Sequence, residues 1–134
     1  MTYDLAIESR GSYLHAKATG DHTAENARRF LAEVYEATVQ KKCRSVLLEL
    51  DLMGPSLPMV EIYDVIAEGS KRGQMLERIA YVDASAERDP ARIRFAENVA
   101  MNRGVNVRLF RTVEEAERWL CAGDVSTSGR RPSR

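Results

Sequence analysis

Residues 45–56 read SVLLELDLMGPS, and this stretch decides how the rest of the chain is interpreted. A short apolar run, broken once by a glutamate, is typical of a strand buried in a sheet, and Asp51 closes it. The Gly-Pro-Ser that follows is typical of a loop that leads into a helix. The stretch therefore predicts a buried strand at 46–50, and it raises the question whether Asp51 or Ser56 carries chemistry.

The composition bounds the class of protein. The chain has 134 residues and 44% hydrophobic content, which suffices for one domain with a core of its own. Lys and Arg number 20 and Asp and Glu number 20, so no overall field favours nucleic acid, and we expect none as a partner. The amino terminus has no cationic leader, and the apolar runs are shorter than the roughly 20 residues of a spanning helix. We expect a cytoplasmic protein that is not an integral membrane protein.

Hydrophobic periodicity on both sides of this strand predicts the order of elements. Apolar side chains alternate at residues 3–7 and 14–18, which indicates an antiparallel hairpin at the start of the chain. Helical spacing alternates with further short strands over the rest of the domain, which predicts an α/β fold with a mainly parallel sheet of about five strands and about four helices. We expect this domain to occupy residues 1–121 and residues 122–134 to form a disordered tail. The remaining expected elements are a helix with apolar positions at 27–38 that ends near 41–43, a helix from 59 that ends near 69–73, helices at 90–104 and 112–120, and strands at 79–82 and 105–109.

Polar residues follow two of the predicted parallel strands, at the sheet edge where ligands and catalytic groups collect. Asp51 and Asp83 could face each other there as a carboxylate pair, but Asp is also ordinary at the end of a strand, and we favour that explanation. The two cysteines and two histidines have no partners at metal, disulfide or triad spacing. We therefore expect no catalytic residue, no metal and no cofactor. The candidate ligand or partner rim consists of Asp51, Gly54, Ser56, Asp83 and Ser85.

Residues 95–120 read FAENVAMNRGVNVRLFRTVEEAERWL. They resemble the closing stretch of the small bacterial SpoIIAA-like or STAS/SEC14-like proteins, a subgroup of the anti-sigma-factor antagonist (STAS) family. The order of elements resembles that family from about Tyr3 to Leu120. The resemblance implies a non-enzymatic regulatory or protein-interaction module. The SEC14-like relatives imply an alternative, a carrier for a small apolar ligand or lipid, bound at the rim and the helix around Ile62.

Switch-type members of the wider family carry a phosphorylatable Ser or Thr directly after the Asp that ends the third strand. Here Asp51 is followed by Leu52 and Met53, so the resemblance does not extend to that switch. We interpret Ser56 instead as the N-cap of the following helix. The segment LLELDLMGP also resembles the phosphoacceptor segment of response-regulator receivers. However, the first strand ends in AIES without an acidic pair and the last in LFRT without a lysine, which makes the receiver the weaker alternative.

One face of the sheet is a candidate interface. If the strands lie in sequence order, as the resemblance implies, right-handed crossovers place every helix on one face. The other face then carries aromatic, aliphatic and charged side chains, a mixture typical of protein interfaces. We therefore predict a homodimer through this face, with a helix or the amino-terminal segment folding across it as the alternative. The candidate interface residues are Tyr13, His15, Leu47, Arg108 and Phe110.

Overall fold

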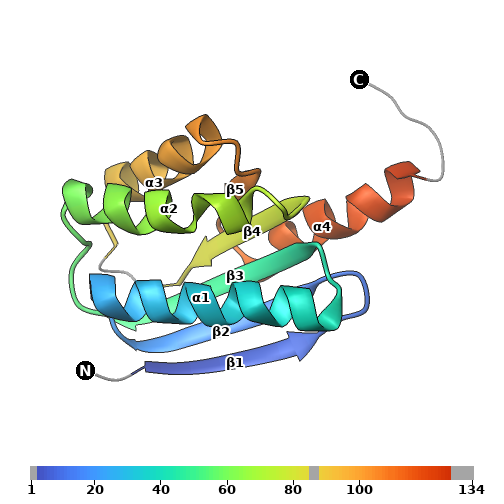
Figure 1. The fold of residues 1–134 in the computed structure, drawn as a ribbon, viewed down its shortest axis with the longest axis horizontal. Helices are drawn as coiled ribbons and strands as arrows, with labels where there is room; N and C mark the ends of the chain where they lie inside the picture. Colours follow the sequence, from blue (N-terminus) through green and yellow to red (C-terminus); the bar gives the residue numbers. More distant parts are fainter. Residues whose placement is uncertain (1–2, 85–87, 128–134) are drawn as a thin grey trace.

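The computed structural model of the protein describes residues 3–84 and 88–127. Within them, five strands form one sheet and four helices cover it, in the arrangement drawn in Figure 1. The strands are β1 (Tyr3–Ser9), β2 (Leu14–Asp21), β3 (Ser45–Met53), β4 (Arg78–Asp83) and β5 (Val107–Phe110). The helices are α1 (Ala24–Lys41), α2 (Met59–Gly73), α3 (Pro90–Asn102) and α4 (Val113–Thr127).

The sheet has the order β1-β2-β3-β4-β5, with β1 antiparallel to β2 and the other neighbours parallel. The predicted fold class is confirmed, and β3 lies in the centre of the sheet. Leu48 and Leu50 are buried on one side of β3, while Leu47 is 0% exposed on the other. Burial on both faces explains why this strand lacks the polar alternation of a half-exposed strand.

Short-range signals set the starts of three helices. The Thr23 side chain accepts a hydrogen bond from the N–H of Asn26 at 3.0 Å and caps α1. Thr112 accepts from Glu115 N–H at 3.2 Å at the start of α4, and Pro90 lies in the first turn of α3. Residues 122–127, which we expected to be irregular, continue α4, and residues 128–134 lie outside the described part of the chain.

The main core lies between the sheet and α1, α2 and α3. Phe30 and Val34 of α1, each 2% exposed, pack on Ala16 of β2 and Leu48 of β3. At the outer edge, Tyr3 of β1 meets the Phe30 ring edge-on, with centroids 5.9 Å apart. None of the helices in the described residues is long and apolar enough to cross a membrane.

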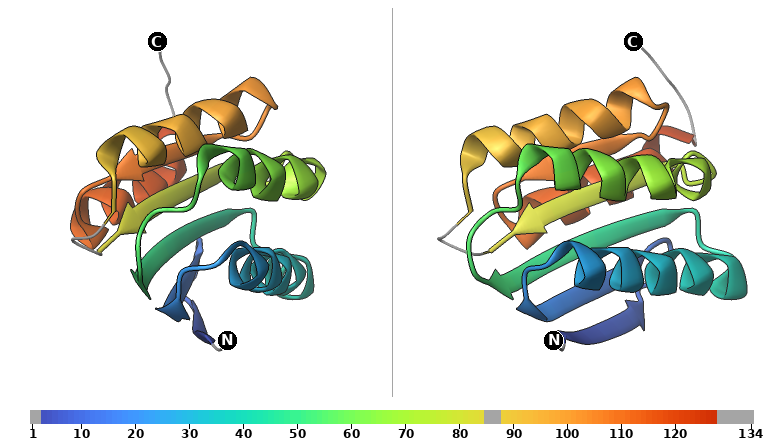
Figure 2. Two further views of the ribbon diagram at one scale, coloured as in Figure 1. Left: turned by 90° about the vertical axis from the view of Figure 1, so that its left-hand side faces the viewer. Right: turned by 60° about the vertical axis from the view of Figure 1, so that its left-hand side comes forward.

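A second core lies on the opposite face of the sheet, under α4 (Figure 2). Leu47 of β3 and Ala80 of β4 pack there against Ala116 and Leu120 of α4. The prediction that every helix lies on one face is therefore wrong. The crossover rule governs a helix that connects two parallel strands, and α4 follows the last strand without leading to another.

The part of the candidate interface formed by Tyr13, Leu47 and Phe110 is consequently an interior contact, as the alternative of a covering helix predicted. Tyr13 is 5% exposed and donates its hydroxyl hydrogen bond to Oε2 of Glu117 in α4 at 2.7 Å. Phe110 packs on Trp119 with ring centroids 5.5 Å apart, and the Arg108 guanidinium lies 5.9 Å from the Trp119 ring. A homodimer contact through Tyr13, Leu47 and Phe110 is thus wrong, because α4 occupies that surface.

His15 lies on the same face of the sheet but pairs with another strand residue. Its Nε2 is 2.8 Å from Oε1 of Glu49 on β3, and Lys17 lies 4.0 Å from the other carboxylate oxygen. The His15 and Glu49 side chains are 15% and 17% exposed. This part of the face is therefore made of polar and charged groups that bind one another, and it offers little apolar contact area.

Candidate functional site

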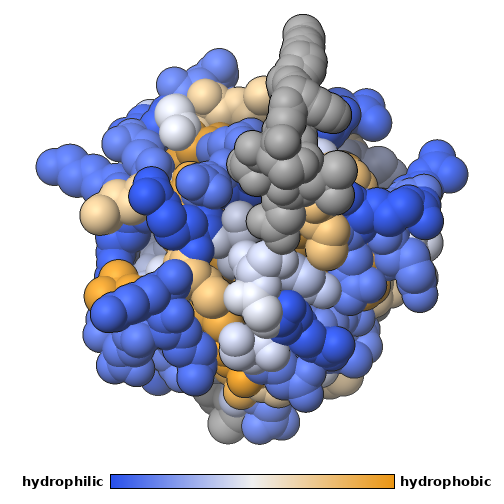
Figure 3. All heavy atoms as spheres, turned by 90° about the vertical axis from the view of Figure 1, so that its right-hand side faces the viewer, coloured by the Kyte–Doolittle hydropathy of each residue, from blue (hydrophilic) through white to orange (hydrophobic). Residues whose placement is uncertain are grey.

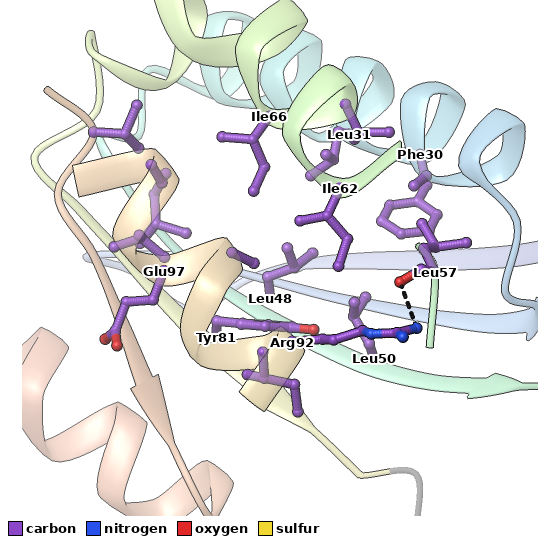
Figure 4. Close-up of a pocket in the computed structure, with 18 of the residues that line it drawn as sticks. Phe30, Leu31, Leu48, Leu50, Leu57, Ile62, Ile66, Tyr81, Arg92 and Glu97 are labelled. Carbon is purple, nitrogen blue, oxygen red and sulfur yellow. Dashed lines mark hydrogen bonds between the residues drawn. The ribbon is translucent and has the colours of Figure 1, made fainter. Parts of the chain in front are cut away.

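An apolar cavity of about 160 Å³, partly open to solvent, lies between the sheet and the helices α1, α2 and α3. Figure 4 shows its side chains converging from the sheet below and the helices above. Unfilled space between apolar side chains is uncommon in a small domain, because side chains normally interdigitate. The principal wall residues are Phe30, Leu31, Leu48, Leu50, Ile62 and Ile66.

The cavity exists because short side chains line it where longer ones would fill it. Ala27 of α1 and Ala96 and Ala100 of α3 all border the space. At the same time, α2 is fixed from its carboxyl end. A Cβ atom at Gly69 would lie 3.2 Å from the Tyr35 ring, and one at Gly73 would lie 3.2 Å from Val105. The glycines permit this close packing, which holds the carboxyl end of α2 against Tyr35 of α1 and Val105 before β5.

Several polar groups of the cavity gather at the end where β3 and β4 give way to loops, while Ser70 and Glu97 border it elsewhere. Arg88 is 8% exposed, and its Nε lies 3.1 Å from Oδ2 of Asp83, with side chains that are 3% and 2% exposed. Its Nη2 donates to the carbonyl of Leu52 at 2.9 Å and its Nη1 to that of Gly54 at 3.1 Å. Tyr81 donates to the same carboxylate oxygen at 3.0 Å. The buried charge pair therefore ties the end of β4 to the loop after β3.

His22 completes this network from the end of β2. Its Nδ1 lies 2.6 Å from Nη1 of Arg88 and 3.1 Å from the carbonyl oxygen of Pro55. A guanidinium can only donate and a carbonyl can only accept, so Nδ1 cannot bond both groups. We assign it to the shorter contact, as the acceptor from Arg88, which places the imidazole proton on Nε2 and leaves the Pro55 carbonyl as a neighbour without a hydrogen bond to the ring. Burial, followed by the positive charge of Arg88, lowers the pKa of His22 below its ordinary value, which keeps the ring neutral.

Ser56 connects the same loop to α3. Its Oγ accepts a hydrogen bond from the backbone N–H of Asp89 at 2.7 Å, and Asp89 is the N-cap of α3. The prediction that Ser56 caps α2 is therefore wrong. That helix begins at Met59 with Pro58 as its N-cap and no side-chain cap. Proline suits the start of a helix because its φ is fixed. Since α2 begins only after Pro58, Ser56 lies too early in the chain to be its N-cap residue.

Arg92 bridges the loop from the other side. It lies in the first turn of α3 and donates through Nη1 to the carbonyl of Leu57 at 3.1 Å and to that of Ser56 at 3.4 Å. In Figure 4 its side chain extends below Ile62 toward Leu57, across one end of the cavity. Arg92 is 38% exposed, so its guanidinium lies between the cavity and solvent.

The remaining rim residues do not form one site. Asp83 is opposite Leu50 in the strand register and lies on the cavity side of the sheet, whereas Asp51, the next residue along β3, is exposed on the other side. The two carboxylates therefore do not face each other, and no cluster of three metal-ligating side chains occurs among the described residues. Gly54 has a φ of 105°, which favours glycine. Ser85 lies outside the described residues.

Sequence reasoning missed the nitrogen-bearing side chains of this site. His22, Arg88 and Arg92 were not identified as site residues, although RDPAR follows a strand that ends in aspartate. An arginine close after such an aspartate was a usable signal for an ion pair. Its burial was not predictable, because it depends on the path of the loop after β3.

Solved structures of similar fold include the following two proteins. The chain is similar to an uncharacterised protein of the DUF3478 family with a SpoIIAA-like fold from Shewanella loihica PV-4, with 24% identity and a TM-score of 0.55 over 89% of this chain and 94% of that one. It is also similar to an anti-sigma factor antagonist from Mycobacterium paratuberculosis, with 15% identity and a TM-score of 0.57 over 90% of this chain and 95% of that one.

The fold is SpoIIAA-like. No protein-family model and no curated protein matches the sequence. The SpoIIAA-like order of elements places Leu52, the residue directly after Asp51, in the core at 2% exposure. Leu52 therefore contributes to packing and carries no hydroxyl group. The first hydroxyl side chain after it in the sequence is that of Ser56, in the following loop.

Proposed function

We propose that this SpoIIAA-like chain is a non-enzymatic binding protein that holds a small apolar molecule in the cavity under α2. The cavity carries the proposal. A dry cavity of about 150 Å³ lined by Leu, Ile and Phe takes up benzene in an engineered protein, and the space here has a similar size and lining. This volume fits a ring or a short alkyl chain. The ligand is therefore smaller than the lipid that the SEC14-like resemblance suggested.

The polar end of the cavity supports a binding role over a catalytic one. Arg88 is occupied by Asp83, His22 and two backbone carbonyls, an arrangement that holds loops together. The Ser56 hydroxyl oxygen accepts a hydrogen bond from the backbone N–H of Asp89. Arg92 donates to the carbonyl oxygen of Leu57. A nucleophile needs an adjacent base, and the contacts of these described side chains do not supply one.

Methyl NMR tests the proposal with a neutral probe. Benzene added to the protein is expected to shift the methyl resonances of Ile62 and Ile66. Ala96→Leu fills the space from α3 and is expected to abolish these shifts while the protein stays folded. Ala122→Leu adds the same atoms at an exposed position of α4 and is expected to change nothing. Unshifted cavity methyls at saturating benzene would disprove ligand uptake.

A second candidate is a regulatory or protein-interaction module, which the likeness to an anti-sigma factor antagonist supports. Exposed apolar side chains lie at the same end of the molecule as the polar groups of the cavity. Met53 is 66% exposed, Met59 45% and Val60 67%. The face at the other end, shown in Figure 3, is dominated by hydrophilic residues with smaller separate apolar areas. A protein partner would therefore bind at the loop after β3.

Quantitative affinity capture from the host tests this candidate. Replacing both Met53 and Val60 by Ser is expected to release a specific partner, while Val39→Ser, at an equally exposed site on α1, is expected to retain it. A capture profile that Met53→Ser and Val60→Ser leave unchanged would remove the candidate. The homodimer itself also stays a prediction, although the contact predicted for it is wrong, and sedimentation velocity can test it.

A further inference from the structure

Three hydrogen-bond donors line the polar end of the cavity with capacity to spare. Nη1 of Arg92 binds two carbonyls, but its Nη2 has no acceptor within the described part of the chain. The Ser56 oxygen accepts from Asp89, which leaves its hydroxyl proton free to donate. The Nδ1 atom of His22 is occupied, which leaves its Nε2–H. All three residues border the cavity.

The three donors belong to one place, because each contacts the same short loop. His22 Nδ1 lies 3.1 Å from the carbonyl of Pro55, and Arg92 Nη1 lies 3.4 Å from the carbonyl of Ser56. The chain therefore presents a guanidinium, a hydroxyl and an imidazole N–H around one end of an otherwise apolar space. Donors without acceptors at such a boundary are costly unless water or a ligand satisfies them.

The neighbouring carboxylates engage only part of this end. Asp83 is paired with Arg88. The Oδ1 atom of Asp89 accepts from Ala91 N–H at 3.0 Å, and its Oδ2 forms an ion pair of 3.7 Å with Nε of Arg92. Asp89 therefore lies on the Nε side of the Arg92 guanidinium, and Nη2 remains available to an anion.

We propose that the ligand is a small amphipathic acid, whose hydrocarbon part fills the cavity and whose carboxylate is bound by Arg92, Ser56 and His22. This inference rests on the proposed function and adds the class of ligand. A carboxylate is acceptor-only and can accept from Nη2 of Arg92 in charge-assisted hydrogen bonds, which are stronger than neutral ones. A neutral amide of the same shape has one acceptor oxygen and brings two N–H groups toward donors, so the site discriminates against it.

Calorimetric titration of the full chain with two matched pairs tests this proposal. Hexanoate is compared with hexanamide, and phenylacetate with phenylacetamide, which separates an alkyl acid from an aryl acid. At least one acid is expected to bind about tenfold more tightly than its amide. Arg92→Gln is expected to lower the affinity for that acid about tenfold and to leave the affinity for the amide unchanged. Arg94→Gln makes the same charge change at an exposed site of α3 and is expected to alter neither.

The remaining outcomes distinguish two claims, that the cavity binds an apolar ligand and that this ligand is an acid. Equal binding of acid and amide, or an Arg92→Gln variant that loses both equally, overturns the acid class and leaves the apolar cavity as the binding site. If none of the four compounds binds while benzene still shifts the cavity methyls, the acid class is again overturned. If benzene also leaves those methyls unshifted, the proposed function fails as well.

Discussion

Arg88 and Asp83 form an ion pair that is almost completely withdrawn from solvent, with Nε 3.1 Å from Oδ2. The pair joins the loop before α3 to the end of β4, and the other nitrogens of Arg88 hold the carbonyls of Leu52 and Gly54 after β3. Two loops that are distant in sequence are thereby fixed to each other at the polar end of the cavity. The shape of that end depends on this single arginine.

Asp83→Asn is expected to lower the free energy of unfolding by about 3 kcal/mol, because it leaves the buried charge of Arg88 without its counter-ion. Urea denaturation measures the change. Glu25→Gln is the matched control, since it breaks an exposed pair with Arg29 at 2.8 Å and is expected to cost no more than about 0.5 kcal/mol. Similar losses in the two variants would show that burial gives the Asp83 pair no special weight.

Ser56→Ala is expected to cost about 1 kcal/mol, because Asp89 N–H loses its acceptor. The location of the effect is more diagnostic than its size. Amide hydrogen exchange is expected to accelerate at the start of α3 and to stay unchanged at Met59 and Val60. Ser12→Ala in the exposed hairpin turn serves as the control. Faster exchange at the start of α2 instead would restore a capping role for Ser56 there.

Leu47→Ala is expected to destabilise the fold by about 3 kcal/mol, since it opens a void between β3 and α4. Met53→Ala is the control on the same strand and the same side of the sheet. Met53 is 66% exposed, so its truncation is expected to change stability by less than about 0.5 kcal/mol. Sedimentation is expected to show the same oligomeric state for both variants. A folded Leu47→Ala protein with unchanged stability but altered association would contradict the packing of α4.

Below pH 6.5, the ordinary pKa of a histidine in the unfolded chain, we expect His22 to make the free energy of unfolding decrease as the pH falls. Its pKa in the folded protein is lowered, so between the two values the unfolded chain binds more protons and the free energy of unfolding declines as pH falls. Above the unfolded value the contribution is constant. Urea denaturation from about pH 7.5 to about pH 5.5 in the wild type and His22→Gln measures it, because contributions from carboxylates are common to both. Parallel curves for the two proteins would contradict the assignment.

The sequence predicts best what depends on neighbours along the chain. The strand at 46–50 is recognisable because burial on both faces requires consecutive apolar residues, and Thr23 and Thr112 cap helices through amides three residues away. The side of the sheet that α4 takes is not predictable in this way, because no following strand constrains it.

The candidate site is predictable only in part for a similar reason. Asp83 and Ser56 are recognisable at the carboxyl ends of strands. Their partners Arg88 and Asp89 reach them through loop conformations that residue types alone do not specify. The cavity is also not predictable from the sequence. It results from alanines such as Ala96, which are common in any helix, and from the position of α2 above them.

The placement of α4 also sets the order in which the molecule can be completed during synthesis. Leu47 and Ala80 are covered by Ala116 and Leu120 of α4. The ribosome adds these two residues after all five strands. A nascent chain that has finished its sheet therefore still exposes the apolar face of β3 and β4. Such a surface attracts chaperones or other unfinished chains until the last helix emerges and closes over it.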